Sequence, residues 1–204
     1  MRVLITAAEA SELPMQIEGL STDCTFKINH KMHVIGVGKV RAYRNLIAEI
    51  NRFKPDRVLH VGTAASLTPD VQIGAVQYVI ATYDGDITDL NGRGIGNPDI
   101  EIDPSSNLLE MESSVSWTSD VALFDRADCN DKVASIDYHA DLYDMEDFSV
   151  ALACYDTHTP VDIYRVVVNH PGDTRDTYRK NASECSSTLE TVIMTYLSKL
   201  ARLL

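Results

Sequence analysis

The chain has 204 residues, of which 45% are hydrophobic and 24% charged, and its formal net charge is −12. This length and composition are typical of one globular domain with a large core, so we expect a single domain over residues 1–204. A broad negative field repels phosphate backbones, which argues against nucleic acid as a partner. No apolar run is long enough to span a bilayer and no cleavage-type segment is present, so we expect no membrane partner and a cytoplasmic protein.

The predicted elements alternate between short apolar strands and helices, which favours an α/β fold. The predicted strands are Arg2–Thr6, His33–Val37, Arg57–Val61, Val76–Ala81, Lys132–Asp137 and Val161–Val168. Several of them are β-branched and apolar on both faces, as expected of strands that are covered on both sides. Helices are predicted over Lys39–Phe53, from Asp147 onward, and over Ala182–Leu204.

Two segments resemble long loops, Tyr83–Asn107 and Asn169–Lys180. The first is rich in Gly, Asp, Asn and Pro, and loops of this length are often functional or mobile. It contains the letters GRGIG, but these lack the G-x-G-x-x-G spacing and no helix-like run follows at once. We therefore reject nucleotide-phosphate binding in this segment.

The cysteines and histidines do not indicate a metal site or a disulfide framework. Cys24, Cys129, Cys154 and Cys185 are far apart and show no paired spacing. The six histidines include no close helical pair such as i, i+4. We expect neither a metal nor another cofactor, and we interpret Cys154 as a core thiol.

The stretch YDMEDFSVALAC, from Tyr143 to Cys154, places acids at the start of an apolar helix. Acidic residues in a first helical turn commonly complement the helix dipole. The alternative is that these acids hold a substrate. The local pattern alone leaves both interpretations open.

Several motifs occur in a recognisable order along nearly the whole chain. They are MRVLITAAEASEL at the start, GVGKVRA at 36–42, KPDRVLHVGTAASL at 54–67, VQIGAVQYVIATYDGDIT at 71–88, YDMEDFSVALAC at 143–154 and TPVDIYRVVVN at 159–169. The series resembles the purine nucleoside phosphorylase/nucleosidase superfamily, and most of all its methylthioadenosine/S-adenosylhomocysteine nucleosidase branch. The combination of GxGK, KPD…VGTA and DMED carries the resemblance.

The resemblance implies a fold, an activity and an assembly. The fold would be a single-domain three-layer α/β/α sandwich with a central mixed sheet. The activity would be hydrolysis of the N-glycosidic bond of a purine-like nucleoside, in nucleoside metabolism and purine salvage. The partners would be a small-molecule nucleoside and a second copy of the chain, because family nucleosidases are homodimers whose partner subunit helps to close the pocket.

The resemblance also assigns roles to individual residues. Glu146 would accept hydrogen bonds from the ribose hydroxyls, and Met145 would pack under the sugar, which suits the chemistry of a carboxylate and a thioether. Glu12 would activate water as a general base. The alternative interpretation of Glu12 is a solvated residue at a strand–helix junction.

Three further residues match family positions around the sugar. Thr63 matches a small hydroxyl residue beside the sugar and the nucleophile, although a helix N-cap is a second interpretation. Ala65 matches a small residue whose backbone lies near the substrate. Arg165 matches an arginine that faces the site, and an arginine in so apolar a strand requires an anionic partner, for which Glu12 and Glu146 are the candidates.

The aromatic residue that stacks on the base should fall within Ser116–Phe124, where Trp117 and Phe124 are candidates for either stacking or the core. Sequence reasoning does not choose between them.

One position departs from the family pattern. Family nucleosidases have an aspartate after the last strand that helps to protonate purine N7, and Asn169 stands there in this chain. An amide cannot supply that proton, but it can donate one hydrogen bond and accept another. The base is then a 6-oxopurine or another unusual base, or His170 or Asp173 has taken over the acid role, or binding persists without catalysis.

A second departure separates hydrolysis from phosphorolysis. Bacterial phosphorylases of the superfamily carry a phosphate-binding arginine just before the Gly-Ser/Thr loop, where this chain has His60. Phosphate needs cationic groups, and the loop AAEASELP offers acids instead. We therefore expect water to be the nucleophile, with a nucleoside phosphorylase and a nucleoside-binding protein without turnover as the rival functions.

Overall fold

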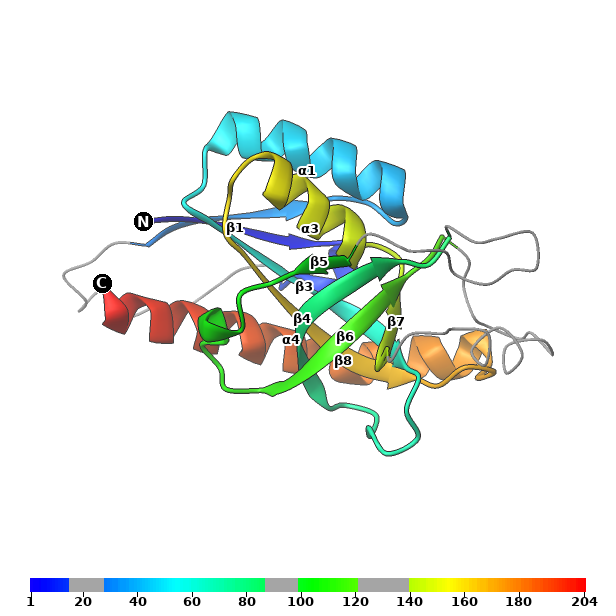
Figure 1. The fold of residues 1–204 in the computed structure, drawn as a ribbon. Coiled ribbons are helices and arrows are strands. Elements are labelled where there is room, and N and C mark those ends of the chain that lie inside the picture. Colours follow the sequence, from blue (N-terminus) through cyan, green and yellow to red (C-terminus); the bar gives the residue numbers. More distant parts are fainter. Residues whose placement is uncertain (15–27, 87–98, 121–139) are drawn as a thin grey trace.

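The computed structural model describes residues 1–14, 28–86, 99–120 and 140–204 (Figure 1). The predicted strand Lys132–Asp137, the stacking candidate Phe124, and the cysteines Cys24 and Cys129 lie outside these residues.

Eight strands within the described ranges form one mixed sheet. They are β1 (Arg2–Ala7), β2 (Asn29–Val34), β3 (Arg57–Ser66), β4 (Val76–Asp84), β5 (Asp99–Glu101), β6 (Glu112–Thr118), β7 (Leu142–Asp144) and β8 (Val161–Asn169). The path through the sheet is β2-β1-β3-β7-β6-β4-β5, and β8 pairs with both β3 and β4. Because of this double pairing, β3, β7, β6, β4 and β8 close into a ring.

The ring brings three distant segments together at one point. Ala65 near the end of β3 pairs with Tyr143 of β7 on one side and with Asn169 of β8 on the other. Ala64 pairs with Val167 whereas Ala65 pairs with Asn169, so β8 has one extra residue, Val168, where the register changes. Three motifs from different parts of the sequence therefore end side by side.

Helices cover both faces of the sheet (Figure 1). The helices α1 (Lys39–Phe53) and α3 (Asp147–Asp156) pack against each other on one side, and α4 (Arg175–Leu203) runs along the other. Two short 3-10 helices, η1 (Ala10–Glu12) and η2 (Pro104–Ser106), lie between strands. The predicted three-layer α/β fold with a mixed sheet is confirmed.

Local sequence explains where the best-predicted elements begin and end. Gly36 and Gly38 before α1 both have φ near +90°, a conformation that residues with a Cβ rarely adopt. The helix ends where Lys54 takes the left-handed conformation immediately before Pro55. Strand β8 is buried along almost its whole length, as its apolar sequence predicts.

The position of β2 and the start of α4 differ from the prediction, for physical reasons. Strand β2 covers Asn29–Val34 rather than His33–Val37, because the edge of the sheet needs no apolar run and its sequence NHKMHV is polar. Helix α4 begins at Arg175, inside the predicted loop, where the side chain of Thr174 caps it by accepting from the N–H of Thr177.

The predicted loop Tyr83–Asn107 was also partly wrong. It contains the end of β4, the short strand β5 and the helix η2. Strand β6, which follows it, was not predicted, because its sequence ESSVSWT carries serines at buried positions that pattern reasoning treats as polar.

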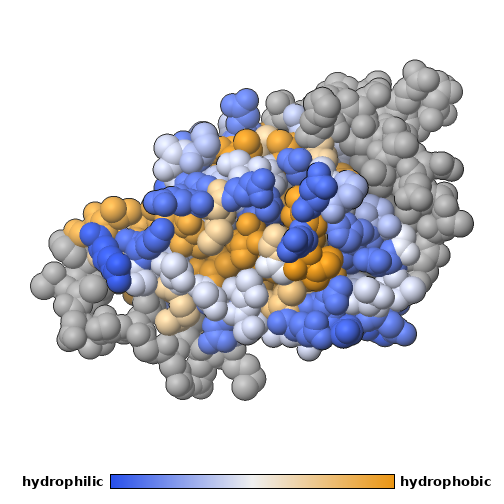
Figure 2. All heavy atoms as spheres, turned by 90° about the horizontal axis from the view of Figure 1, so that it is seen from below, coloured by the Kyte–Doolittle hydropathy of each residue, from blue (hydrophilic) through white to orange (hydrophobic). Residues whose placement is uncertain are grey.

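The face seen from below in Figure 2 carries hydrophilic residues around its periphery and hydrophobic residues in its middle. No helix in the described ranges is both long and apolar enough to cross a membrane. Cys154 and Cys185 are buried and free, and burial raises the pKa of the Cys154 thiol, as expected of a core residue.

A buried polar network ties α4 to the sheet at the start of β8. The fully buried carboxylate of Asp162 accepts hydrogen bonds from the hydroxyls of Tyr196 and Ser106, and lies 3.1 Å from Arg57 Nη1. Burial raises the pKa of Asp162, while these partners oppose that rise. The Tyr196 hydroxyl is the link from α4 to this carboxylate.

The change Tyr196→Phe should therefore lower the free energy of unfolding by about 1–3 kcal/mol, because a buried carboxylate oxygen loses a donor. Urea denaturation measures the difference. Tyr155→Phe is the matched control, because Tyr155 is 70% exposed and its change should fall within about 0.5 kcal/mol of the wild type. Equal effects of the two changes would contradict the role given to Tyr196.

Candidate functional site

A cavity of about 520 Å³ lies where β3, β7 and β8 end. This volume is within the range of small-molecule sites, roughly 300–1,000 Å³. Six of the seven predicted site residues line it: Glu12, Thr63, Ala65, Met145, Glu146 and Asn169. The seventh, Arg165, lies behind the cavity wall and is completely buried. The described residues include no group of three or more His, Cys, Asp or Glu side chains placed to hold a metal ion.

Glu12 is held by backbone and side-chain donors. Its Oε2 accepts from the N–H groups of Ala8 and Glu9, both at 3.1 Å, and its Oε1 accepts from Thr63 N at 2.8 Å and Thr63 Oγ1 at 3.0 Å. Glu12 is only 8% exposed, so it is not the solvated residue of the alternative interpretation. A buried carboxylate with fixed orientation therefore faces the cavity beside a threonine hydroxyl.

Thr63 is not a helix N-cap, because it lies inside strand β3. Its backbone N–H and its hydroxyl both serve Glu12, and its carbonyl oxygen accepts from Arg165 Nη1 at 3.3 Å. The threonine thus connects the carboxylate at the cavity to the buried guanidinium behind it.

Glu146 points into the cavity from the residue just before α3. Its Oε1 accepts from Gly38 N at 3.0 Å, and its Oε2 lies 3.6 Å from Arg165 Nη2. Burial raises the pKa of this carboxyl to about 7, against the opposing effects of Arg165 and the Gly38 N–H. Glu146 is therefore a carboxylate that titrates near neutral pH at the cavity surface.

The helix-capping role belongs to Asp144 rather than to Glu146. Asp144 Oδ1 accepts from the N–H groups of Glu146 at 2.7 Å and Asp147 at 2.6 Å, while Glu146 makes no side-chain cap bond. The N–H of Phe148 is satisfied by Thr118 Oγ1 at 2.9 Å. Because the orphan N–H groups of α3 have other acceptors, the Glu146 carboxylate is left to face the cavity.

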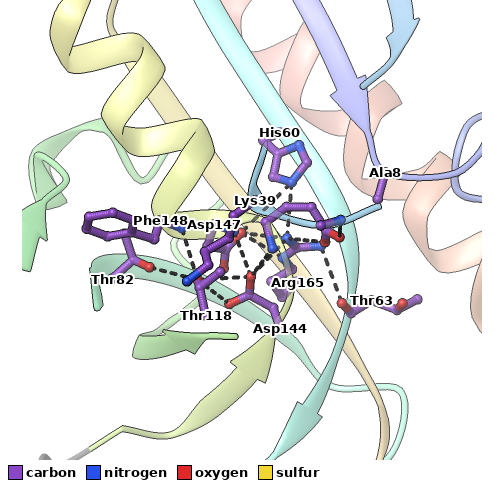
Figure 3. A network of polar contacts seen from close by, with 12 residues as sticks. Ala8, Lys39, His60, Thr63, Thr82, Thr118, Asp144, Asp147, Phe148 and Arg165 are labelled. Carbon is purple, nitrogen blue, oxygen red and sulfur yellow. Dashed lines mark hydrogen bonds and ion pairs between the residues drawn. The ribbon is translucent and has the colours of Figure 1, made fainter. Parts of the chain in front are cut away.

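The anionic partner of Arg165 is Asp147, which sequence analysis did not propose. Arg165 donates through Nε at 2.9 Å and Nη2 at 2.6 Å to Asp147 Oδ1 (Figure 3). Glu146 is a secondary neighbour at 3.6 Å, and Asp144 lies at 3.7 Å. Both Arg165 and Asp147 are fully buried.

These contacts set the charge states of the buried groups. Burial alone would lower the pKa of Arg165, but Asp147, Asp144 and Glu146 raise it. Burial would raise the pKa of Asp147, but Arg165 holds it below its usual value. Burial and the charge of Asp147 raise the pKa of Asp144 well above its usual value. The buried cation is thus matched by one ionised aspartate.

His60 contacts the same Nη2 of the guanidinium and lies beside Asp147 (Figure 3). Its Nε2 lies 3.1 Å from Arg165 Nη2, and its Nδ1 lies 3.2 Å from the carbonyl oxygen of Thr6. Arg165 can only donate, so Nε2 accepts and the ring proton resides on Nδ1, which donates to Thr6. Burial and Arg165 lower the pKa of His60 to about 3, so the imidazole is neutral.

The GxGK motif contributes a structural function that the sequence did not reveal. Lys39 Nζ pairs with Asp84 and, at 2.6 Å, with Asp86, and its backbone N–H donates to Asp120 at 2.8 Å. These contacts anchor the start of α1 to the loops after β4 and β6. The adjacent Gly38 N–H is thereby held where it meets Glu146.

Asn169 lies at the end of β8 and is 3% exposed. Its Nδ2 donates to the carbonyl oxygen of His170 at 3.2 Å. Asp173 instead accepts from the His170 N–H at 2.8 Å, as part of the turn before α4. Of these three residues, Asn169 alone is among the described residues that line the cavity.

The cavity contains residues that sequence analysis missed. Tyr143 and Tyr178 are its described aromatic lining residues, whereas Trp117 is 3% exposed and packs with Ala65 and Tyr143 beside it. Arg175 and Arg179, in the first turns of α4, also line it. Arg175, Tyr178 and Arg179 have the spacing of residues on one face of a helix, which could have predicted that they lie together. They were missed because the segment was interpreted as a loop.

Comparisons with known proteins agree with the arrangement. A sequence profile described as the phosphorylase superfamily matches residues 25–198. The chain belongs to this superfamily. An aminodeoxyfutalosine nucleosidase of Campylobacter jejuni is 29% identical over an alignment 153 residues long. The alignment covers 67% of this chain and 66% of that enzyme, just under two thirds of its length.

Solved structures of the superfamily share the fold. A 5'-methylthioadenosine/S-adenosylhomocysteine nucleosidase of S. pneumoniae superposes with a TM-score of 0.81 at 18% identity, over 98% of this chain and 100% of that one. A futalosine hydrolase mutant of Helicobacter pylori superposes with a TM-score of 0.78 at 18% identity, over 100% and 99%. The superfamily resemblance inferred from the sequence motifs is confirmed.

The change Asp147→Asn should lower the free energy of unfolding by about 3–5 kcal/mol, because it removes the one carboxylate that accepts hydrogen bonds from the buried Arg165 guanidinium. Urea denaturation measures the effect. Asp70→Asn, on an exposed loop, is the matched control and should be nearly neutral. A loss below about 1 kcal/mol for Asp147→Asn would show that Arg165 does not depend on this carboxylate.

Proposed function

We propose that this chain is a nucleosidase that hydrolyses the N-glycosidic bond of a purine-like nucleoside to a free base and a sugar. The observation that carries the proposal is the convergence of Glu12, Glu146 and Asn169 on one cavity. The enzyme of Campylobacter jejuni that resembles this chain is a nucleosidase by name, which supports the same reaction class.

The sugar would lie against Glu146 and Met145. One ionised carboxylate can accept hydrogen bonds from two vicinal hydroxyls, and such charge-assisted bonds are the strong kind. Glu146 is fixed by the Gly38 N–H through Oε1, which leaves Oε2 directed between Arg165 and the cavity. The thioether of Met145, which is half-buried in the cavity wall, offers an apolar contact to the sugar face.

Water would be activated by Glu12. The transition state for loss of the base carries positive charge on the sugar, and the carboxylates of Glu12 and Glu146 would stabilise that charge electrostatically. Thr63 orients Glu12 through two hydrogen bonds and would contact the attacking water. Ala65, which has no bulky side chain, leaves room for the substrate beside β3.

The base would contact Asn169. Its side chain can donate a second hydrogen bond through Nδ2 and accept one through Oδ1. This pattern fits a 6-oxopurine, and His170 and Asp173 are placed outside the cavity lining of the described residues. The proton that the leaving base takes up would therefore come from solvent rather than from either neighbour.

Hydrolysis is favoured over phosphorolysis by the state of His60. A phosphate site needs a cation at that position, whereas His60 is neutral, fully buried and engaged with Thr6 and Arg165. Arg165 is in turn committed to Asp147. A nucleoside phosphorylase is the second candidate, and base release measured with and without inorganic phosphate separates the two reactions.

The assembly would be a homodimer that acts in cytoplasmic purine salvage. Three exposed valines lie from the last residue of β2 to the first turn of α1, namely Val34, Val37 and Val40, and Val37 also lines the cavity. Apolar side chains at the rim of a cavity fit burial against a second subunit.

The change Glu12→Gln should lower kcat for base release by about a hundredfold to ten-thousandfold, because a carboxamide cannot accept a proton from water. Mass spectrometry of bases released from a nucleoside panel, without phosphate, provides the assay. Glu190→Gln on the exposed face of α4 is the control. Near-full activity of Glu12→Gln would remove Glu12 from the base role, and a strict phosphate requirement of the wild type would overturn hydrolysis.

The change Asn169→Asp should shift preference from inosine toward adenosine by about tenfold or more in the ratio of kcat/KM values, because a carboxylate repels the 6-oxopurine pattern. Asn51→Asp, exposed on α1, should leave the ratio unchanged. Activity that appears only in Asn169→Asp would support a binding protein that lost its catalytic acid. An unchanged ratio would place Asn169 away from the base.

The change Val40→Glu should convert the homodimer into a monomer. Val40 is 77% exposed in the single chain and would be buried against the second subunit in the proposed dimer, so the change would bury an unpaired charge. Light scattering at micromolar concentration compares it with the wild type. A wild type that is monomeric under these conditions would overturn the proposed dimer.

A further inference from the structure

The carboxyl of Asp147 has one oxygen that no N–H group serves. Its Oδ1 accepts both hydrogen bonds that Arg165 donates to it, at 2.9 and 2.6 Å. Its Oδ2 is buried and receives no N–H or hydroxyl donor from the described residues. Buried acceptors in native proteins almost always have a donor, because leaving one without a partner is costly. This oxygen therefore requires a donor of another kind.

Asp144 is the neighbour that can supply this donor. Its carboxyl forms a side-chain hydrogen bond with the carboxyl of Asp147, within the polar network around Arg165 (Figure 3). Ionised carboxylates only accept hydrogen bonds, so two of them cannot bond to each other. The contact is a hydrogen bond only when one of the two carboxyls carries a proton and donates it. One proton between the two groups satisfies the oxygen that the N–H groups leave unserved.

The other contacts of the two carboxyls place that proton on Asp144. Asp147 Oδ1 lies 2.6 Å from Arg165 Nη2, whereas Asp144 Oδ1 lies 3.7 Å from the same atom. Asp144 Oδ1 accepts the N–H groups of Glu146 and Asp147, as the carbonyl oxygen of a neutral carboxyl can. Thr118 Oγ1 lies 3.1 Å from Oδ1 and 3.2 Å from Oδ2, so its single proton can serve Oδ1 and leave Oδ2 for the carboxyl proton.

The directions of the pKa shifts agree with this placement. Burial and the negative charge of Asp147 raise the pKa of Asp144 well above its usual value. Burial would also raise the pKa of Asp147, but Arg165 lowers it. The carboxyl that contacts the cation is therefore the ionised one, and its neighbour is the neutral one.

The charges around the pair require the same proton. Arg165 on β8 is the cation that these carboxyls contact, because His60 on β3 is fully buried and neutral. Asp147, Asp144 and Glu146 all lie within 3.7 Å of Arg165 Nη2. If all three were ionised, two buried negative charges would remain without a cation, which is strongly unfavourable. With one proton on the pair, Asp147 matches Arg165, and Glu146 is the carboxyl that is left to titrate.

We propose that Asp144 carries a proton and donates it to Asp147 Oδ2, so that the two carboxyls act as one anion against Arg165. Asp144 lines the cavity, but it does so as a neutral group. It is a positioning residue that acts through Glu146, because a neutral neighbour does not oppose the negative charge of Glu146 when sugar hydroxyls bind there. The inference rests on the proposed function only where it gives Glu146 the sugar.

Carbon-13 NMR of carboxyl-labelled aspartate detects the proton directly, with the signal of Asp144 assigned through Asp144→Asn. In the wild type at neutral pH, this signal should be that of a protonated carboxyl. Asp147→Asn should turn Asp144 into a carboxylate at the same pH, because the negative charge that holds the proton is removed while Arg165 remains. If Asp147→Asn does not fold, the wild-type spectrum decides alone. An Asp144 that is ionised at neutral pH in the wild type overturns the proposal.

The titration of Glu146 provides an independent test. Asp144→Asn replaces one neutral group with another, so it should leave the midpoint of Glu146 where it is in the wild type. Glu12→Gln is the matched control, because the charge of Glu12, besides burial, raises the pKa of Glu146. The control should therefore move the midpoint downward. A downward shift of the same size in Asp144→Asn would show that Asp144 is ionised, and the shared proton would be wrong.

The pH profile of base release separates this inference from the proposed function. If Glu146 holds the sugar as a carboxylate, kcat/KM should fall as the pH falls through the Glu146 midpoint, and at the same pH in Asp144→Asn as in the wild type. A fall at lower pH in the variant contradicts a neutral Asp144. If no nucleoside releases its base, the proposed function fails, and the two NMR measurements still decide the shared proton.

Discussion

The ion pair between Arg165 and Asp147 fixes the geometry on which the rest of the site depends. It joins the middle of β8 to the first residue of α3, and both partners are fully buried. The remaining donors of the guanidinium reach the Thr63 carbonyl and His60, so strands β3 and β8 are set relative to the helix. Gly62 is required beside it, because a Cβ there would lie 2.0 Å from Arg165 Nη1.

This buried cation also explains how several acids can meet at one cavity. Asp147 neutralises Arg165, the pKa of Asp144 is raised so that its negative charge is suppressed, and Glu146 lies at the edge of the same group. The balance leaves Glu146 close to its titration point rather than permanently charged or permanently neutral. A site of this kind can present a carboxylate to the sugar without a full unmatched charge in the core.

Sequence reasoning named residues that line the cavity and missed the groups that support them. Glu12, Glu146 and Asn169 were named because they lie in motifs whose order is informative along the whole chain, and their roles stay predictions. The partner of Arg165 was missed because Asp147 looked like an ordinary acid in the first turn of a helix. Only the folded structure brings Arg165 of β8 within 2.9 Å of this carboxylate. Arg175 and Arg179 of α4 were missed because the polar sequence at the start of this helix was interpreted as a loop. Strands were predicted well where they are apolar, and poorly where β2 and β6 use polar residues.

Titration of Glu146 tests most directly whether burial and the Arg165–Asp147 ion pair set the charge state of this carboxyl. Carbon-13 NMR of carboxyl-labelled glutamate, with the signal assigned through Glu146→Gln, follows this group from the protonated form at low pH to the carboxylate at high pH. The midpoint should lie at about 7, because the effect of burial on the pKa of Glu146 outweighs the opposing effects of Arg165 and the Gly38 N–H. Arg165→Met should move the midpoint upward, since it removes the cation that favours the carboxylate. A wild-type midpoint at the ordinary value of a glutamate, about 4.3, would contradict the account.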